Sequence, residues 1–357
     1  MIINTDKKRL LYIGQRRYDR LSGAAQVNIR NIRCLEKIFG ENMDFIEPED
    51  SRKFFLYRWG GNRGFREELR KRLSETSYDY AFISQSLLGD VARIIKETAP
   101  DTKIVTFFHN IEVQYAREFV RTSGVTHTPF YIAAGMAEKN AVRYSDYYIV
   151  LNDRDAELLH RIYHVSPSLI LPTSFEDSFD EKKATEAPNK DNGVVQYLFV
   201  GSAFFANIEG LGWFIKKVLP YVPGRLVVVG NGMDGYRSVW KDSRVEVHGF
   251  VEDLSDFYYT SDIVVSPIFS GGGMKTKIAE ALMFGKTIIG TDEALTGYVR
   301  EPKSMLLCNT AEEFIKSIDR MIGESRICKY NQISRRIFKD NYSYQASLGL
   351  LEKFFMS

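Results

Sequence analysis

The chain has 357 residues, of which 44% are hydrophobic, 26% charged and 13% aromatic. This is the composition of a globular protein of about two domains, and ten prolines with 26 glycines exclude collagen and low-complexity disorder. The 48 basic residues nearly balance the 46 acidic ones. The chain as a whole therefore lacks the excess of positive charge that is typical of nucleic-acid-binding proteins, and no nucleic-acid partner is expected.

Short apolar runs alternate with amphipathic stretches through the first half of the chain. Apolar residues recur at helical spacing over 24–39, and further helical stretches cover 87–98 and 130–144. This alternation predicts an α/β domain over residues 1–172, with a doubly wound parallel sheet and helices on both faces. The predicted strands of this domain are 10–14, 43–46, 78–84, 103–108 and 147–151.

Basic residues are concentrated near the start of the chain. Residues 1–72 contain 17 Lys and Arg against 10 Asp and Glu. Two interpretations stay open: a solvated face, or a surface for anionic lipid or an anionic acceptor. The clusters are Lys7–Arg9, Arg16 with Arg17, Arg20, Arg52 with Lys53, and the stretch from Arg58 to Arg72.

A polar stretch without periodicity, 173–193, predicts an interdomain linker. The alternation then resumes and predicts a second α/β domain over 194–340. The tail, 341–357, is helical in pattern, and its apolar residues need a surface to cover, so we expect it to pack back on the first domain. The predicted strands of the second domain are 197–201, 226–230, 245–250, 263–268, 287–291 and 305–309.

The strongest signal for chemistry lies in residues 263–291. A buried strand ends at Pro267, and a glycine-rich loop, 270–273, opens onto a helix predicted from about residue 274 to 284. Backbone N–H groups at such a turn, together with the helix dipole, form a phosphate site. Lys275 or Lys277 can supply mobile charge, and Glu280 can accept hydrogen bonds from a ribose. The alternative is an ordinary helix start with a Lys277–Glu280 surface pair.

This stretch resembles the signature of the retaining glycosyltransferases of the GT-B fold, family four, in which a Gly-rich turn and a lysine precede a Glu-Ala pair, here Glu280-Ala281. The resemblance covers residues ~195–310 well and the first half of the chain loosely. It implies two Rossmann-like doubly wound domains facing a central cleft. It also implies a nucleotide sugar on the second domain and an acceptor on the first.

The resemblance also implies roles for particular residues. The backbone of the glycine-rich loop would hold a diphosphate, Glu280 the ribose, and the backbone of Phe250 and Val251 the base. The implied catalytic residues are His109, Lys277 and Glu280. The implied donor-binding residues are Gly23, Ser202, Gly230, Phe250, Val251, Ser270, Gly271, Gly272, Gly273, Met274, Lys275, Lys277 and Glu280.

Two positions depart from the family pattern. Many members carry a further Glu eight residues before the position of Glu280, where this chain has Gly272. Many also carry Arg and Lys after the first strand of the second domain, where residues 201–205 contain neither. The lysines at 275 and 277 must then balance the diphosphate.

Three other patterns have simpler explanations. Residues 230–235, GNGMDG, match the G-x-G-x-x-G pattern of NAD-binding proteins. The pattern is weak evidence alone, and here it follows the second strand of its domain. Asp153 and Asp155 look like a metal motif, although acidic residues are also favoured at helix starts. Asn207 is interpreted as a helix N-cap. His109 is a separate case: it follows a predicted strand, and it either lines a ligand crevice or caps the next helix.

We therefore expect a retaining glycosyltransferase that moves a hexose from a nucleotide diphosphate sugar to a hydroxyl of a glycan or lipid-linked acceptor, in bacterial surface polysaccharide biosynthesis. No metal is expected, because no cluster of His, Cys and carboxylate residues has metal-ligand spacing, and no cofactor is expected beside the nucleotide sugar substrate. Cys34, Cys308 and Cys328 have neither disulfide nor zinc-ribbon spacing. The expected location is the cytoplasm, with peripheral contact to the anionic inner membrane leaflet. The alternatives left open are a non-catalytic GT-B subunit that binds glycan or a partner protein, and a nucleotide-sugar epimerase.

Overall fold

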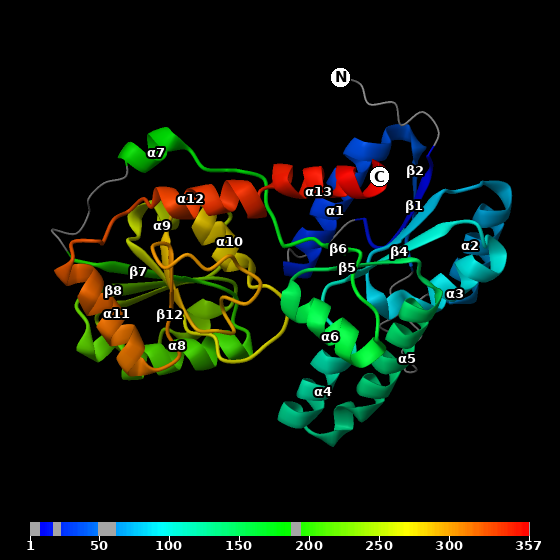
Figure 1. The fold of residues 1–357 in the computed structure, drawn as a ribbon. Coiled ribbons are helices and arrows are strands. Elements are labelled where there is room, and N and C mark those ends of the chain that lie inside the picture. The colour runs from blue at the N-terminus through cyan, green and yellow to red at the C-terminus, as the bar shows by residue number, and fades with distance from the viewer. Residues whose placement is uncertain (1–7, 17–22, 49–61, 187–193, 357) are drawn as a thin grey trace. The chain divides into compact units, whose positions relative to one another are not determined.

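The computed structural model describes residues 8–16, 23–48, 62–186 and 194–356. The chain divides into two compact units, 1–172 with 347–357, and 173–346. In each unit a six-stranded parallel sheet carries helices on both faces (Figure 1). The doubly wound α/β architecture predicted from the alternating pattern is confirmed.

The first sheet has the order β2-β1-β3-β4-β5-β6. The order reverses at β1, because β2 pairs with one of its edges and β3 with the other. The five predicted strands are present, whereas the last strand is only two residues long, too short to give a periodic pattern. The strands are β1 (Leu10–Ile13), β2 (Met43–Ile46), β3 (Tyr80–Ile83), β4 (Lys103–Phe108), β5 (Tyr147–Val150) and β6 (Leu169–Ile170).

Helices cover both faces of this sheet. Buried residues of α2 and α3 pack with β1 and β3 on one face. On the other face, the Phe355 ring of the tail lies 5.2 Å from the Phe39 ring of α1 and 5.1 Å from the Tyr80 ring of β3, between centroids. The helices are α1 (Gly23–Phe39), α2 (Arg63–Glu75), α3 (Gly89–Thr98), α4 (Glu112–Ser123), α5 (Thr128–Tyr144), α6 (Asp153–Tyr163) and α13 (Tyr344–Met356).

Helix α2 contains the last part of the basic stretch, and several of its cations are paired. The ion pairs are Arg63–Glu67, Arg72–Glu68, Lys71–Glu75 and Arg66–Asp90, at 2.7, 3.3, 3.9 and 3.6 Å. For α2 this favours the solvated face over an anion-binding one. Most of the other basic residues of the clusters, such as Arg20 and Arg52, lie outside the described residues.

The second sheet has the order β12-β11-β10-β7-β8-β9. Here the order reverses at β7, which pairs with β8 on one side and β10 on the other. All six predicted strands are present, with ends shifted by one or two residues. They are β7 (Gln196–Val200), β8 (Arg225–Val229), β9 (Val245–His248), β10 (Ile263–Ser266), β11 (Thr287–Gly290) and β12 (Met305–Leu307).

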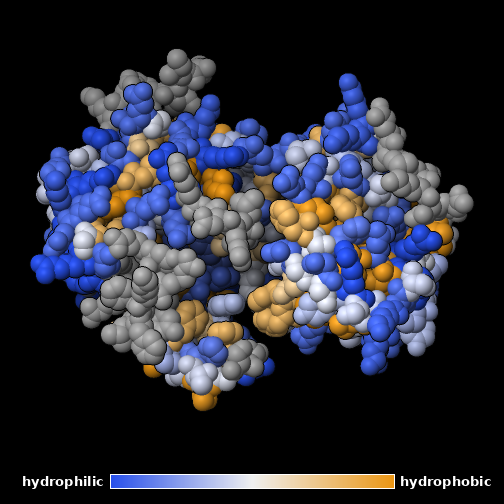
Figure 2. Space-filling model, turned by 180° about the vertical axis from the view of Figure 1, so that it is seen from behind, coloured by the Kyte–Doolittle hydropathy of each residue, from blue (hydrophilic) through white to orange (hydrophobic). Residues whose placement is uncertain are grey.

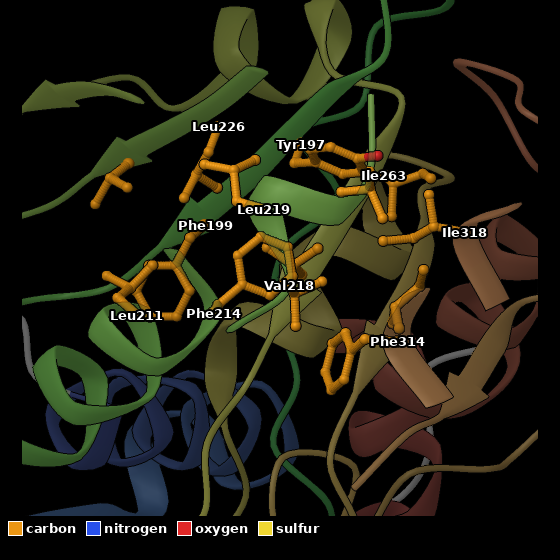
Figure 3. Close-up of a cluster of buried hydrophobic side chains, with 14 of the residues drawn as sticks. Tyr197, Phe199, Leu211, Phe214, Val218, Leu219, Leu226, Ile263, Phe314 and Ile318 are labelled. Atoms are coloured by element: carbon orange, nitrogen blue, oxygen red, sulfur yellow. The ribbon is translucent and has the colours of Figure 1, made fainter. Parts of the chain in front are cut away.

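Aromatic rings fill the core on one face of this sheet. Figure 3 shows Tyr197 and Phe199 of β7 among Leu211 and Phe214 of α8 and Phe314 of α11. The rings of Phe214 and Phe314 lie 5.8 Å apart between centroids. The helices of this unit are α7 (Glu181–Glu186), α8 (Phe205–Lys217), α9 (Ser255–Thr260), α10 (Thr276–Met283), α11 (Ala311–Gly323), α12 (Gln332–Ile337) and the π-helical turn η7 (Phe338–Tyr342).

The first part of the predicted linker, 173–193, packs against α12 of the second unit. Arg335 Nη2 of α12 lies 2.5 Å from Asp177 Oδ2, and its guanidinium lies 4.6 Å from the centroid of the Phe179 ring. That ring also stacks on Tyr330 at 5.4 Å. One acidic and one aromatic residue thus fix this polar stretch to the second unit, an arrangement that composition does not reveal.

Close packing of α8 beneath the β10 loop leads to a stability prediction. A Cβ added at Gly210 would lie 1.8 Å from the carbonyl oxygen of Pro267, whereas at Gly212 its nearest neighbour would be Trp240 Nε1 at 3.9 Å. Gly210→Ala should therefore lower the free energy of unfolding by about 2–3 kcal/mol, because backbone must move. Gly212→Ala, in the same helix, should raise it by up to ~1 kcal/mol. Equal melting temperatures for the two variants would contradict this packing.

Candidate donor-binding site

The candidate site lies at the carboxyl edge of the second sheet, where the strand order reverses. The segments that follow β7 and β10 diverge there toward α8 and α10. In open parallel sheets, ligands bind at this kind of reversal. Ser202 follows β7, and the glycine-rich loop 270–273 follows β10, so the fold brings these two predicted segments to neighbouring strands.

Two glycines give the loop its shape. Gly271 and Gly273 have φ values of 131° and 60°, which side-chain-bearing residues rarely adopt. Lys275 is the N-cap residue of α10, which begins at Thr276, two residues later than predicted. The first N–H groups of a helix have no partner within it, and they carry the positive end of its dipole. Through such N–H groups the loop and this helix start could bind an anion.

Lys277 is the second residue of α10, and its side chain is buried. Its Nζ lies 2.8 Å from Asn207 Oδ1 and 4.0 Å from the centroid of the Phe199 ring. A Cβ at Gly201, the residue after β7, would lie 2.7 Å from the same Nζ, so a larger residue there would have to displace the Lys277 side chain. Burial, assisted by the charge of Lys275, lowers the pKa of Lys277 to about 7, although Glu280 opposes this. A buried cation of this kind gains stability from an anionic ligand.

Asn207 was expected to cap its helix, and this expectation is wrong. Helix α8 begins at Phe205 with Phe204 at its cap position, so Asn207 lies inside the first turn. Its amide instead accepts from Lys277 Nζ and donates to the Ser202 carbonyl, 2.8 Å away. The sequence offered only the residue type and its place near a predicted helix start. Both are the same for an asparagine that caps a helix and for one that links Lys277 to the Ser202 carbonyl.

Glu280 lies one turn after Lys277 on α10. Tyr258, on α9, donates its hydroxyl to Glu280 Oε2 at 3.3 Å. Burial raises the pKa of Glu280 to about 7, while the Tyr258 hydrogen bond and the Lys277 charge oppose the increase. A partly buried carboxylate beside a cation can accept hydrogen bonds from ligand hydroxyls. The sequence did not point to Tyr258.

The two lysines that the sequence left as alternatives have different surroundings. Lys275 Nζ lies 2.7 Å from Glu293 Oε1 and 3.1 Å from the Gly272 carbonyl oxygen, so its charge is already balanced by a carboxylate. Lys277 Nζ instead contacts the neutral amide of Asn207 and the aromatic ring of Phe199. Lys277 is therefore the better candidate to meet a diphosphate.

The remaining residues predicted for the donor surround this centre or follow β9. A Cβ at Gly230 would lie 2.0 Å from the Gly201 carbonyl oxygen, so the backbone segments after β7 and β8 lie too close together there for a side chain. The Ser270 hydroxyl oxygen is buried without a hydrogen-bond partner among the described residues. Met274 is buried. Phe250 and Val251 follow β9, and the Phe250 side chain is 72% exposed.

Two predicted residues belong to the first unit. Gly23 is the first residue of α1 and is exposed. His109 is buried beyond β4, and its Nε2 lies 2.9 Å from Asn28 Oδ1. Burial and the nearby charge of Arg30 lower the pKa of His109 to about 4. The neutral imidazole is therefore the favoured form at pH 7, and the catalytic role predicted for His109 stays a prediction.

The apparent metal motif at Asp153 and Asp155 is a helix start. Asn152 caps α6 by accepting from the backbone N–H of Asp155 at 3.0 Å, and it donates to the Asp155 carboxylate at 2.8 Å. Within the described ranges, no group of three or more His, Cys, Asp or Glu side chains could hold a metal ion.

Residues 195–324 match the family model of glycosyl transferases group 1. The whole chain is also similar to solved structures. Sucrose-phosphate synthase from Thermosynechococcus elongatus aligns with a TM-score of 0.73 at 14% identity, over 98% of each chain. The Anabaena protein HepE, solved in complex with UDP-glucose, gives 0.67 at 13% identity, over 98% of this chain and all of that one. The catalytic domain of starch synthase IV from Arabidopsis thaliana, bound to ADP and acarbose, gives 0.64 at 11% identity, over 98% and 99%.

These comparisons indicate a glycosyltransferase with the GT-B fold. The matched residues lie within the second unit, 173–346, which holds Lys277, Glu280 and the glycine-rich loop. No curated protein matches the chain by sequence. In the part of the chain that the structure describes, no helix combines the length and apolar character that crossing a bilayer requires.

Proposed function

We propose that this glycosyltransferase transfers a hexose from a nucleoside diphosphate sugar with retention of configuration. The observation that supports this most is the buried Lys277, held by Asn207 beside the start of α10 and the glycine-rich loop. Nucleotides are bound by two of the similar proteins, UDP-glucose by HepE and ADP by starch synthase IV. A nucleoside diphosphate therefore suits this cradle.

In the proposed reaction the bond between the anomeric carbon and the β-phosphate oxygen breaks. An acceptor hydroxyl oxygen forms the new bond to that carbon on the same face, and its proton passes to the departing phosphate oxygen. Negative charge grows on the phosphate during bond breaking. Lys277 and the N–H groups at the start of α10 stabilise that charge, and such preorganised groups usually contribute the largest catalytic effect. We propose that they balance it without a metal ion.

We assign the ribose to Glu280, whose carboxylate is available at the next turn of the same helix. The base contacts the backbone of Phe250 and Val251 in this proposal. Backbone contacts distinguish bases poorly, so the proposal leaves UDP, GDP and ADP as probes for binding.

We further propose a lipid-linked or glycan acceptor on the first unit, met at the anionic inner membrane leaflet in surface polysaccharide synthesis. Beyond the end of α4 and along α5, Val125, Ile132 and Met136 are 81%, 55% and 64% exposed. Figure 2 shows hydrophobic side chains in small groups on a mainly hydrophilic surface. The same helices carry the exposed cations Arg117, Lys139 and Arg143, while Arg121 lies 3.9 Å from Glu118.

An apolar surface flanked by cations favours anionic lipid. The protein should therefore float with vesicles that contain phosphatidylglycerol at low salt, and not with neutral vesicles. High salt should release it. Equal recovery with both vesicles would contradict the membrane proposal.

Calorimetric titration with UDP, GDP and ADP tests the donor. One of them should bind, and above pH 7 the affinity should fall by up to tenfold per pH unit. The reason is that Lys277, with a pKa of about 7, must regain its proton to meet the diphosphate. Protons should be taken up on binding at pH 8, as measured in two buffers of different ionisation heat. No binding at millimolar concentration would instead favour a non-catalytic subunit.

A further inference from the structure

The segment that follows β11, 291–299, contacts Lys275 at two separate points. Glu293 Oε1 lies 2.7 Å from Lys275 Nζ. The Tyr298 hydroxyl donates to the Lys275 carbonyl oxygen at 2.8 Å. All three side chains are largely removed from water, with 14% of Lys275, 20% of Glu293 and 5% of Tyr298 exposed. One segment thus holds both the side chain and the backbone of the residue that precedes α10.

These contacts extend into the glycine-rich loop. Lys275 Nζ also donates to the carbonyl oxygens of Gly272 and Gly273, at 3.1 and 3.4 Å. Gly271 and Gly273 have positive φ values, and glycine is the most flexible residue of an unfolded or loosely held chain. A loop of three consecutive glycines therefore depends on contacts from outside to keep one conformation, and Lys275 provides them.

Tyr298 is itself held from its other side. Its ring lies 4.8 Å from the ring of Tyr342, between centroids. The Tyr342 hydroxyl accepts from the backbone N–H of Val299 at 2.6 Å. The backbone of Tyr342 is fixed in turn, because its carbonyl oxygen accepts from the N–H of Phe175 at 3.0 Å. The hydroxyl of Tyr298 is thereby fixed where it meets Lys275.

We propose that Lys275, Glu293 and Tyr298 form a clamp that positions the glycine-rich loop and the start of α10 for the diphosphate of the donor. In this proposal, which rests on the proposed function, Lys275 is a positioning residue and Lys277 is the cation that meets the ligand. The opposite arrangement would have Lys275 leave Glu293 to bind the diphosphate. The two predict opposite signs for Glu293→Gln, since removing a competing carboxylate would strengthen diphosphate binding, and loosening the clamp would weaken it.

The test uses the nucleoside diphosphate that the wild-type protein binds, with the matching monophosphate as reference ligand. Tyr298→Phe removes one hydroxyl and keeps the ring, and Glu293→Gln removes one charge. Each should weaken diphosphate binding about threefold to tenfold, the usual effect of one hydrogen bond, and leave monophosphate binding within twofold. A general loss of structure would weaken both ligands alike.

Tyr197→Phe is the matched control. The Tyr197 hydroxyl donates to the Pro223 carbonyl oxygen at 2.7 Å, a bond of the same kind in the same unit, away from the loop. It should lower the melting temperature without changing the affinity for either nucleotide. Unchanged diphosphate affinity in Tyr298→Phe, or tighter binding by Glu293→Gln, overturns the clamp alone. A wild-type protein that binds no nucleoside diphosphate overturns the proposed function and the clamp with it.

Discussion

Lys277→Met is expected to reduce glycosyl transfer by about 10²–10³-fold, because it removes a preorganised cation from the departing phosphate. The same change should leave the melting temperature unchanged or raise it. Burial lowers the pKa of Lys277 to about 7, so in the free protein this side chain is held in surroundings that disfavour its charge. Methionine fills similar volume without that cost. Initial rates and thermal denaturation measure the two effects on the same preparation.

Lys286 offers a matched control for this prediction. It is also buried, and burial lowers its pKa to about 7 as well. Its Nζ, however, donates to two backbone carbonyl oxygens, those of Ser261 and Lys329, which would each lose a partner, whereas Lys277 donates to the single side-chain oxygen of Asn207. Lys286→Met should therefore lower the melting temperature and leave turnover per folded molecule nearly unchanged. If Lys277→Met destabilises the protein as Lys286→Met does, or keeps wild-type turnover, the role assigned to Lys277 is wrong.

Glu280→Gln is expected to lower kcat/KM for the donor by about 10–100-fold, the range for a hydrogen bond to a charged group. Most of the loss should appear in KM, because a ribose contact is made equally in the ground state and in the transition state. Stability should be retained, since burial raises the pKa of Glu280 to about 7 and an amide avoids the buried charge.

Tyr258→Phe is the companion variant, because it removes the hydroxyl that donates to Glu280 and leaves the carboxylate in place. A much smaller loss in kcat/KM is expected for it. If Glu280→Gln leaves the KM for the donor unchanged, Glu280 does not contact the donor, whatever the effect on kcat.

Much of the fold could be predicted because it follows from periodic patterns of buried residues. The strands of both sheets are continuous apolar runs, such as those of β4 and β10, and these are typical of parallel sheets that are covered on both faces. The strand order was not predictable in the same way. It depends on which strands pair across the sheet, and the reversal at β7 that positions the candidate site arises from that pairing.

The candidate site was predictable where local chemistry defines it and not where tertiary contacts do. The glycine-rich loop before α10 could be recognised because glycine and a helix start have local requirements. Asn207 and Tyr298 could not be recognised in this way. Asn207 acts through Lys277, 70 residues away in the sequence, and Tyr298 acts through Lys275, 23 residues away. The choice between Lys275 and Lys277 likewise depended on Glu293, whose approach to the loop leaves no pattern in the sequence.

A crystal structure with a nucleoside diphosphate bound is the most direct test of the central claim. The account predicts the β-phosphate against the backbone N–H groups of the loop and the start of α10, with an oxygen within hydrogen-bond distance of Lys277 Nζ. It further predicts that Lys275 stays with Glu293. A diphosphate bound elsewhere, or an empty loop at saturating nucleotide, would contradict the account.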